Sequence, residues 1–177
     1  TGEPVEVTNA TSECIGVAFI SANQKVMIAK ADATDGTNST LYWGYNLYGQ
    51  DVPNLENLAD NTAAKADYNG KANTAVIAAA SSDARDMCTV LNTFNASDSY
   101  NDWYIPALGQ LALMHLNITE INAALAKIGG TALASDRYLS SSEKNYSYEW
   151  YVSFYNGKVE SISKGDYTNR VRFIRDI

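Results

Sequence analysis

The most constraining feature of the sequence is a pair of alternating, aromatic-rich segments joined by Asn156-Gly157. Asn-Gly in this setting is the strongest short-range signal for a β-hairpin, because both residues tolerate the positive φ angles that the favoured two-residue turns require. The segments cover residues 149–155 and 158–163. A two-residue turn predicts the pairs Tyr155 with Lys158, Phe154 with Val159, and Ser153 with Glu160. The sequence therefore predicts antiparallel β-structure near the C-terminus.

Alternation along the first segment separates its side chains into two faces. One face carries Trp150, Val152 and Phe154 and is the candidate core face; the other carries Tyr151, Ser153 and Tyr155. Half of the 12 tyrosines follow residue 137. Tyrosine is a good strand former and is often half exposed, which is one explanation. The other is a recognition surface, because Tyr, Ser, Asn and Gly dominate binding loops. The density of Tyr, Asn and Ser favours recognition.

Composition limits the partners of the chain. It has 177 residues with 13 Lys and Arg against 20 Asp and Glu, a formal charge of −7. That length suits one domain with a real core. The acidic balance argues against nucleic acid and anionic membranes as partners. No apolar run is long enough to span a membrane, so we expect no membrane insertion. No signal sequence opens the chain, which indicates that a targeting segment was never present or was removed.

Residue types needed for catalysis are scarce. There is one histidine, His115, in an apolar helical stretch where a helix-end position is the better interpretation. Known nucleophile, phosphate-binding and zinc motifs are missing, so we expect no enzyme activity, no metal and no cofactor. Cys14 and Cys88 either pair in an oxidising compartment or are both buried thiols. Residues 32–38 and 67–70 combine Asp, Asn and Gly, but they lack the EF-hand order and are better interpreted as turns than as calcium sites.

Hydrophobic periodicity predicts a mixed α+β domain. Strands are expected at residues 15–20, 25–29, 137–141 and 169–175, in addition to the hairpin. Helices are expected at residues 72–94, at 107–116 after Pro106, and at 118–128 before Gly129-Gly130. Residues 31–70 form a long segment with the aromatics Tyr42, Trp43, Tyr45 and Tyr48 and little periodicity, which indicates a functional or internally packed loop. We expect Val171, Phe173 and Ile174 in the core, and Arg172 and Arg175 paired with carboxylates.

The order of motifs over residues 15–177 resembles a bacterial extracellular domain family. The matching stretches are Asp102-Trp103-Tyr104-Ile105-Pro106, Gln110-Leu111, Tyr138-Leu139-Ser140-Ser141, Trp150, Gly157, Lys164 and Val171-Arg172-Phe173-Ile174-Arg175. The family is typified by the C-terminal adhesin domain of legionella collagen-like proteins. The resemblance implies a C-type-lectin-like fold with two to three helices packed on small antiparallel sheets and long loops. It also allows an oligomer, a trimer by analogy. The calcium-sugar motif of calcium-dependent lectins is missing.

A second resemblance lies within residues 138–175. This stretch is similar to the variable region of proteins diversified by retroelements that mutagenise adenines, in which Asn-type codons change to Tyr, Ser, Asp and similar residues. The implied variable, ligand-binding positions are Asn145, Tyr146, Ser147, Tyr148, Tyr151, Ser153, Tyr155, Asn156, Ser161, Ser163, Asp166, Tyr167 and Asn169. Glu143, Trp150, Lys158, Glu160 and Lys164 would then belong mostly to the scaffold.

These observations predict one α+β, C-type-lectin-like domain over residues 1–177. Residues 1–14 form an N-terminal extension, and residues 138–175 form the ligand-binding region. The first functional hypothesis is a diversified receptor-binding or adhesion module displayed on a bacterial surface or a virion. The second is an adhesin domain of fixed specificity that binds carbohydrate or host matrix on a cell-surface or pilus protein. In either case the partner is an unidentified protein or glycan on a cell surface.

Overall fold

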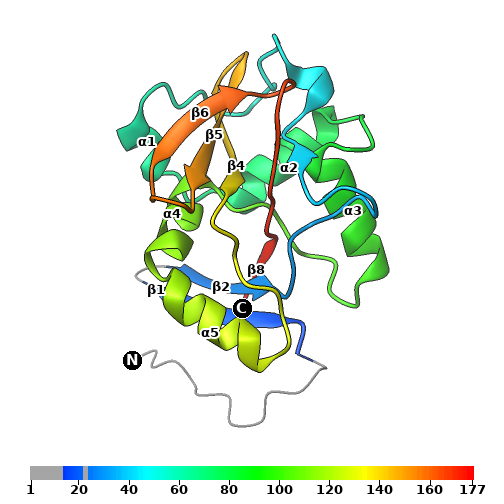
Figure 1. The fold of residues 1–177 in the computed structure, drawn as a ribbon. Coiled ribbons are helices and arrows are strands. Elements are labelled where there is room, and N and C mark those ends of the chain that lie inside the picture. Colours follow the sequence, from blue (N-terminus) through cyan, green and yellow to red (C-terminus); the bar gives the residue numbers. More distant parts are fainter. Residues whose placement is uncertain (1–13, 22–23) are drawn as a thin grey trace.

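The computed structural model describes residues 14–21 and 24–177, and it confirms an α+β architecture (Figure 1). The described part contains five α-helices and three small antiparallel sheets, which is more helix than the two to three predicted. In chain order, the elements are β1 (Gly16–Ser21), β2 (Gln24–Ala29), β3 (Leu41–Tyr42), the 3-10 helix η1 (Tyr45–Leu47), α1 (Asn61–Lys65), α2 (Gly70–Ala80), α3 (Met87–Ser97), α4 (Leu108–Leu116), α5 (Ile118–Lys127), β4 (Arg137–Asn145), β5 (Tyr148–Ser153), β6 (Val159–Ser163), β7 (Thr168–Asn169) and β8 (Ile174–Asp176). Apart from Cys14, the predicted N-terminal extension lies outside the described residues.

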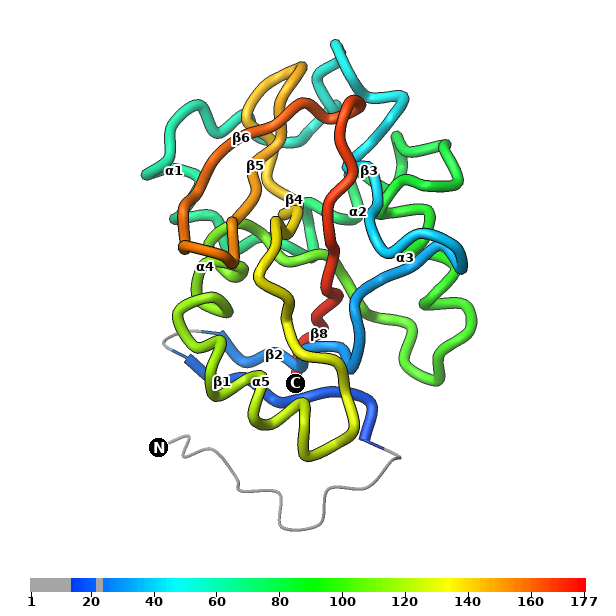
Figure 2. The backbone as a smooth tube through the Cα atoms, viewed as in Figure 1, coloured from blue at the N-terminus to red at the C-terminus, as the bar shows by residue number. Residues whose placement is uncertain are grey.

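The sheets lie at different ends of the molecule. One has the order β1-β2-β8, so the last strand of the chain pairs with the second. Another has the order β4-β5-β6, and β3 and β7 form a third sheet of two strands. Figure 2 shows the β4-β5-β6 sheet toward the top and β1, β2 and β8 toward the bottom, with α5 beside the lower sheet. Among the described residues, no helix is both long enough and apolar enough to cross a bilayer.

Two hydrophobic clusters form the core. The first packs α4 and α5 against the sheets and includes Leu111, Leu125 and Trp150. The second surrounds Trp43 and includes Tyr151 and Phe173. Strand β5 therefore supplies core residues from both of its faces. The predicted core face of the hairpin is confirmed, but the opposite face is not a free surface.

The long helix predicted over residues 72–94 is two helices, α2 and α3. Between the two helices the backbone is not helical, and the Arg85 carbonyl accepts a hydrogen bond from Tyr42 N at 3.0 Å. The Asp86 carboxylate accepts a second one, from Tyr45 N at 2.7 Å. The Ser-Ser-Asp stretch at 81–83 favours this break, because these side chains compete with helical backbone bonds. The apolar pattern stays in phase across the gap, so periodicity alone could not detect it.

The hairpin is present, but its register differs from the prediction by two residues. Val152, not Phe154, lies opposite Val159, and Tyr151 lies opposite Glu160. The turn is longer than two residues: Ser153 N donates to Lys158 O at 2.8 Å, and Gly157 N donates to Ser153 O at 2.7 Å. Phe154 leaves the strand to pack its ring 4.5 Å from that of Tyr138. A shift of two residues keeps each side chain on its predicted face.

Other predicted elements agree with the structure. The strands near the N-terminus and the helices α4 and α5 lie within one or two residues of their predicted bounds, and Gly129 ends α5 with a φ of 66°. His115 lies in the last turn of α4, as expected. The single strand predicted at 169–175 is wrong, because β7 and β8 belong to different sheets. The predicted loop 31–70 contains β3, η1 and α1, the last capped by Asp60.

Candidate ligand-recognition surface

Five exposed tyrosines lie on three segments at one end of the molecule. Two come from the η1 region, two from the β4–β5 turn and strand β5, and one from the segment after β6. They are Tyr45, Tyr48, Tyr146, Tyr148 and Tyr167, with 45–56% of each side chain exposed. Figure 2 shows the three segments together at the top of the chain trace. We call this group the tyrosine-rich end.

Backbone contacts hold the three segments together. Lys164 N donates to Ser147 O at 3.1 Å, which joins the post-β6 segment to the β4–β5 turn. Gly165 packs directly on the η1 region: a Cβ at this position would lie 3.0 Å from Tyr48 Cβ and 3.1 Å from Tyr45 O. These close approaches leave little room for a side chain at position 165. The tyrosines are therefore carried by loops that pack on one another.

A buried ion pair anchors the same segments from beneath. The Lys164 ammonium contacts the Glu143 carboxylate, and both side chains are fully buried. Lys164 Nζ also donates to Gln50 O at 2.9 Å and lies 5.0 Å from the centre of the Trp43 ring. Glu143 Oε1 accepts a further hydrogen bond from Val52 N at 3.3 Å. Lys164 thus connects β4, the segment after η1 and its own loop.

The predicted contact residues fall into three groups by burial. Exposed ones are Tyr146, Tyr148, Tyr155, Asn156, Asp166 and Tyr167; half-buried ones are Asn145, Ser153 and Ser161; buried ones are Ser147, Tyr151, Ser163 and Asn169. A buried side chain cannot meet a ligand while the fold is intact, so the prediction is corrected for the last group. Tyr151 is the clearest correction, because its ring belongs to the second core cluster and only its hydroxyl reaches outward, to Glu160 at 2.7 Å.

Some of the small polar residues serve the scaffold. Asn145 Oδ1 accepts hydrogen bonds from Ser147 N and Tyr148 N at 2.9 and 3.0 Å, which fixes the β4–β5 turn. Ser163 Oγ donates to Asp166 Oδ2 at 2.7 Å and orders the next loop. These contacts hold the backbone that displays Tyr146, Tyr148 and Tyr167. Asn145 and Ser163 therefore position the exposed tyrosines through these hydrogen bonds.

The hairpin turn is a separate site. Tyr155, 79% exposed, and Asn156 lie at the opposite end of the β5–β6 hairpin, beside α4 (Figure 1). The turn packs on α4, because a Cβ at Gly157 would lie 2.6 Å from His115 Cε1. The predicted residues therefore do not form one continuous surface.

Tyr45 and Tyr48 were missed as surface residues in the sequence prediction. The available signal was the run of aromatics in the long segment 31–70, which indicated a functional or internally packed loop. The structure divides that run: Trp43 is fully buried and donates from Nε1 to Ser140 O at 2.8 Å, whereas Tyr45 and Tyr48 point outward. The buried Trp43 fixes this loop in the core, and the two exposed tyrosines that follow it join the surface.

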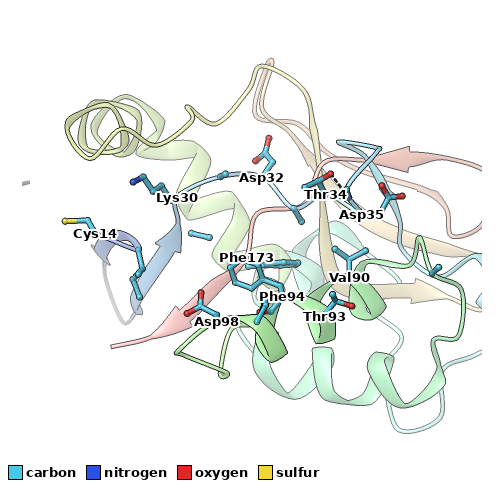
Figure 3. A pocket seen from close by; sticks show the side chains of 17 residues that line it. Cys14, Lys30, Asp32, Thr34, Asp35, Val90, Thr93, Phe94, Asp98 and Phe173 are labelled. Carbon is cyan, nitrogen blue, oxygen red and sulfur yellow. Dashed lines mark hydrogen bonds between the residues drawn. The ribbon is translucent and has the colours of Figure 1, made fainter. Parts of the chain in front are cut away.

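An apolar pocket lies elsewhere and is the second candidate. Its volume is about 740 Å³, within the usual range for small-molecule sites. Figure 3 shows Phe94 and Phe173 in it, between the segment after β2 and α3. Its polar groups are already engaged. Asp32 binds Arg170 and Arg172, and the Asp35 carboxylate caps its own turn, where the Asn38 side chain lowers the pKa of Asp35 to about 2. The carboxylates of Asp32 and Asp35 are therefore already bonded within the chain and are not free to orient a ligand.

The acidic stretches considered for calcium are turns held by their own residues. Asp35 Oδ1 accepts from Thr37 N and Asn38 N at 2.9 and 2.6 Å. Asp67 Oδ2 accepts from Asn73 and from Ser142 Oγ, the latter at 2.6 Å. Within residues 14–21 and 24–177, no group of three or more His, Cys, Asp or Glu side chains is arranged to hold a metal. Both cysteines are free thiols: Cys88 is buried, and Cys14 partly so.

Comparison with known proteins adds a fold relationship. No known protein family and no curated protein matches the sequence. Among solved structures, a fimbrial protein from Bacteroides ovatus is similar, with a TM-score of 0.59 and 14% sequence identity over 86% of this chain. The match covers 36% of that protein, so this chain spans about a third of its length. At this identity the similarity concerns the fold alone, and the lectin-like assignment stays a prediction.

Proposed function

We propose that this chain is a non-enzymatic ligand-recognition module of an adhesion or receptor-binding protein, and that the tyrosine-rich end is its contact surface. The observation that carries the proposal is the concentration of five exposed tyrosines on three segments over a buried ion pair. Tyrosine offers a large, rigid contact area at low entropy cost. Single exposed aromatics need no explanation, but a group on one end marks an interaction site.

The charge of this end restricts its ligand. Asp51 and Asp166 are exposed beside it, whereas Lys164 is buried and Lys144 is half-buried, with its Nζ 4.9 Å from the centre of the Trp150 ring. Like charges at an interface weaken binding and slow association. The ligand is therefore a neutral or basic surface, such as an uncharged glycan or a basic protein patch, displayed on a cell. The resemblance to a fimbrial protein supports a location at the bacterial cell surface. Display on a virion is the alternative.

Diversification of this surface is the finer form of the proposal. Of the residues assigned to the scaffold, Glu143, Trp150 and Lys164 are buried, and Lys158 and Glu160 are exposed. The variable candidates Tyr146 and Tyr167 are exposed. A fixed core beneath changeable loop residues lets the ligand change while the fold is kept. Related copies of the gene would then differ at Tyr146, Tyr148, Asp166 and Tyr167, and would keep the buried set. Identical C-terminal regions in several isolates would instead favour the adhesin of fixed specificity.

The test is a binding measurement with tyrosine variants. The labelled protein is applied to an array of neutral, sulfated and sialylated glycans and to bacterial and host cells. Tyr48→Ser and Tyr167→Ser are expected to weaken binding about tenfold or more each, the size of a contact hot spot. Tyr155→Ser and Tyr100→Ser are matched controls, because both residues are exposed away from the three segments. An equal loss in the controls, or binding confined to sulfated glycans, would refute the proposal.

A further inference from the structure

A second carboxylic acid lies beside the buried ion pair. Glu143 and Glu149 face each other directly across β4 and β5, and both side chains are fully buried. Lys164 satisfies one oxygen of Glu143. Glu143 Oε2 and both carboxyl oxygens of Glu149 have no hydrogen-bond partner. The single amine is thus bound to Glu143, and three of the four carboxyl oxygens of the two acids have no hydrogen-bond partner.

The charge balance decides the protonation of this cluster. If both acids were ionised, the site would hold a net charge of −1 without access to water, which is strongly unfavourable. Burial raises the pKa of Glu149 well above its ordinary value, and it also raises that of Glu143, which Lys164 partly offsets. The other charged or titratable groups facing the cluster are Asp51 beside Glu143, and Asp166 and Tyr151 beside Glu149. None of them supplies a positive charge.

We propose that Glu149 is a positioning residue for the tyrosine-rich end: it acts through Lys164, and its ionisation loosens the three segments that Lys164 joins. As a neutral acid, Glu149 leaves Lys164 bound to Glu143 and Gln50. As a carboxylate, it competes with Glu143 for the single amine. The excess charge is then relieved by opening the loops to water, which disperses the five tyrosines. The biological role of this device rests on the proposed function, whereas its test does not depend on that function.

The expected pH dependence has a definite sign. Opening exposes Glu149 to water, so its pKa is near its ordinary value of about 4.5 in the open form and higher in the closed form. Between these two values the closed form binds one more proton. Protection of the three segments therefore falls about tenfold per pH unit as the pH rises through this window, and it is constant above the window.

Hydrogen exchange of the full chain measures this directly. Protection factors, corrected for the intrinsic exchange rate, are compared from about pH 5 to about pH 9 in residues 44–50, 145–148 and 164–167. We expect the tenfold slope in the native protein and no slope in Glu149→Gln, which keeps the neutral shape. Glu120→Gln is the matched control, because Glu120 is exposed on α5.

Three outcomes overturn the proposal: the same slope in Glu149→Gln as in the native protein, no slope in the native protein, or a slope spread equally over α4 and α5. Should Glu149→Gln fail to fold, the native protein alone still decides, since confinement of the slope to the three segments is required. Exchange needs no ligand. Absence of the slope in the native protein thus refutes this inference, whereas a lack of binding refutes only the proposed function.

Discussion

The molecule contains two buried cation networks, and they are completed to different degrees. Near the β1-β2-β8 sheet, the fully buried Arg172 donates from Nε to Asp32 at 2.7 Å and from Nη1 to Ala29 O at 3.0 Å. It also donates to Thr131 O at 3.1 Å. Asp32 in turn binds Arg170 and the Tyr138 hydroxyl. Beneath the tyrosine-rich end, the Lys164 network leaves three carboxyl oxygens without partners.

The difference follows from the side chains. Arginine presents five donors in a fixed fork and is always charged, so it can join several acceptors permanently. Lysine supplies three donors on a flexible stem, and a buried carboxylic acid beside it can gain or lose a proton. A completed network makes rigid scaffold, whereas an incomplete one leaves its segments adjustable. The scaffold network lies far from the tyrosines, and the adjustable one lies beneath them.

Removing Arg172 should have the largest effect. Arg172→Met removes the side-chain donor from three carbonyl oxygens, those of Ala29, Thr131 and Ala132, and takes one of its two arginine partners from Asp32. We expect a loss of about 3–5 kcal/mol in the free energy of unfolding, measured by urea titration. Arg172→Lys is the control: it keeps the charge but not the fork, so most of the loss should persist. A loss below about 1 kcal/mol would show that this network is not the rigid part of the scaffold.

Removing Lys164 should cost less, about 2–3 kcal/mol, because Glu143 can take up a proton once its partner is gone. Without the amine, the pKa of Glu143 rises further above its ordinary value. The folded state then holds a proton that the unfolded chain releases, so the loss in Lys164→Met should grow as the pH increases. Urea titrations at about pH 5 and about pH 8 measure this. The added pH dependence should vanish in Lys164→Met/Glu143→Gln; a loss independent of pH contradicts the charge argument.

The sequence predicted the networks only in part. Pairing of Arg172 and Arg175 with carboxylates is confirmed, at Asp32 and Asp102, because an arginine among core residues must be paired. Glu143 and Lys164 were assigned to the scaffold, and both side chains are fully buried. Their contact joins positions 21 residues apart in different elements, and nothing in local periodicity indicates which acid meets which base. Glu149 was not recognised at all, because an acid on an alternating strand normally faces water.

The sequence predicted the exposure of candidate contact residues only in turns, where neighbouring residues along the chain determine whether a side chain is exposed. Turn positions such as Tyr146 and Tyr167 are exposed, as expected from loops. Strand alternation misled the prediction for Tyr151, because β5 packs against core on both faces. Tyr45 and Tyr48 join the surface through a tertiary contact with Gly165, more than a hundred positions away. Propensity and periodicity describe a segment, whereas a surface is made by segments that meet.

Two tyrosine hydroxyls give a finer comparison. The Tyr138 hydroxyl binds Asp32 and accepts from Ala134 N at 2.8 Å, and burial next to Asp32 raises the pKa of Tyr138 to about 12. Tyr138→Phe leaves Ala134 N and the carboxylate short of a partner, so we expect a loss of about 1–1.5 kcal/mol. Tyr151→Phe removes a bond to the exposed Glu160 and should cost about 0.5 kcal/mol. Equal losses in urea titration would mean that the Arg172 network is no more rigid than its surroundings.

The smallest effect is expected at an exposed ion pair. This pair tests whether the losses in the free energy of unfolding arise from burial of the charges or from their pairing. Lys71 Nζ lies 2.9 Å from Asp176 Oδ2, a good contact distance, yet both side chains are more than half exposed. Water and salt screen such a pair, so Lys71→Met should change the free energy of unfolding by less than about 0.5 kcal/mol. Added salt should reduce even that difference, whereas it should leave the loss in Arg172→Met unchanged. A loss at Lys71 as large as that at Lys164 would mean that pairing itself stabilises this fold. A small loss at Lys71 would mean that a charged side chain stabilises this fold only where it is buried. Protonation of the buried acids beneath the tyrosine-rich end would then affect the shape of that surface.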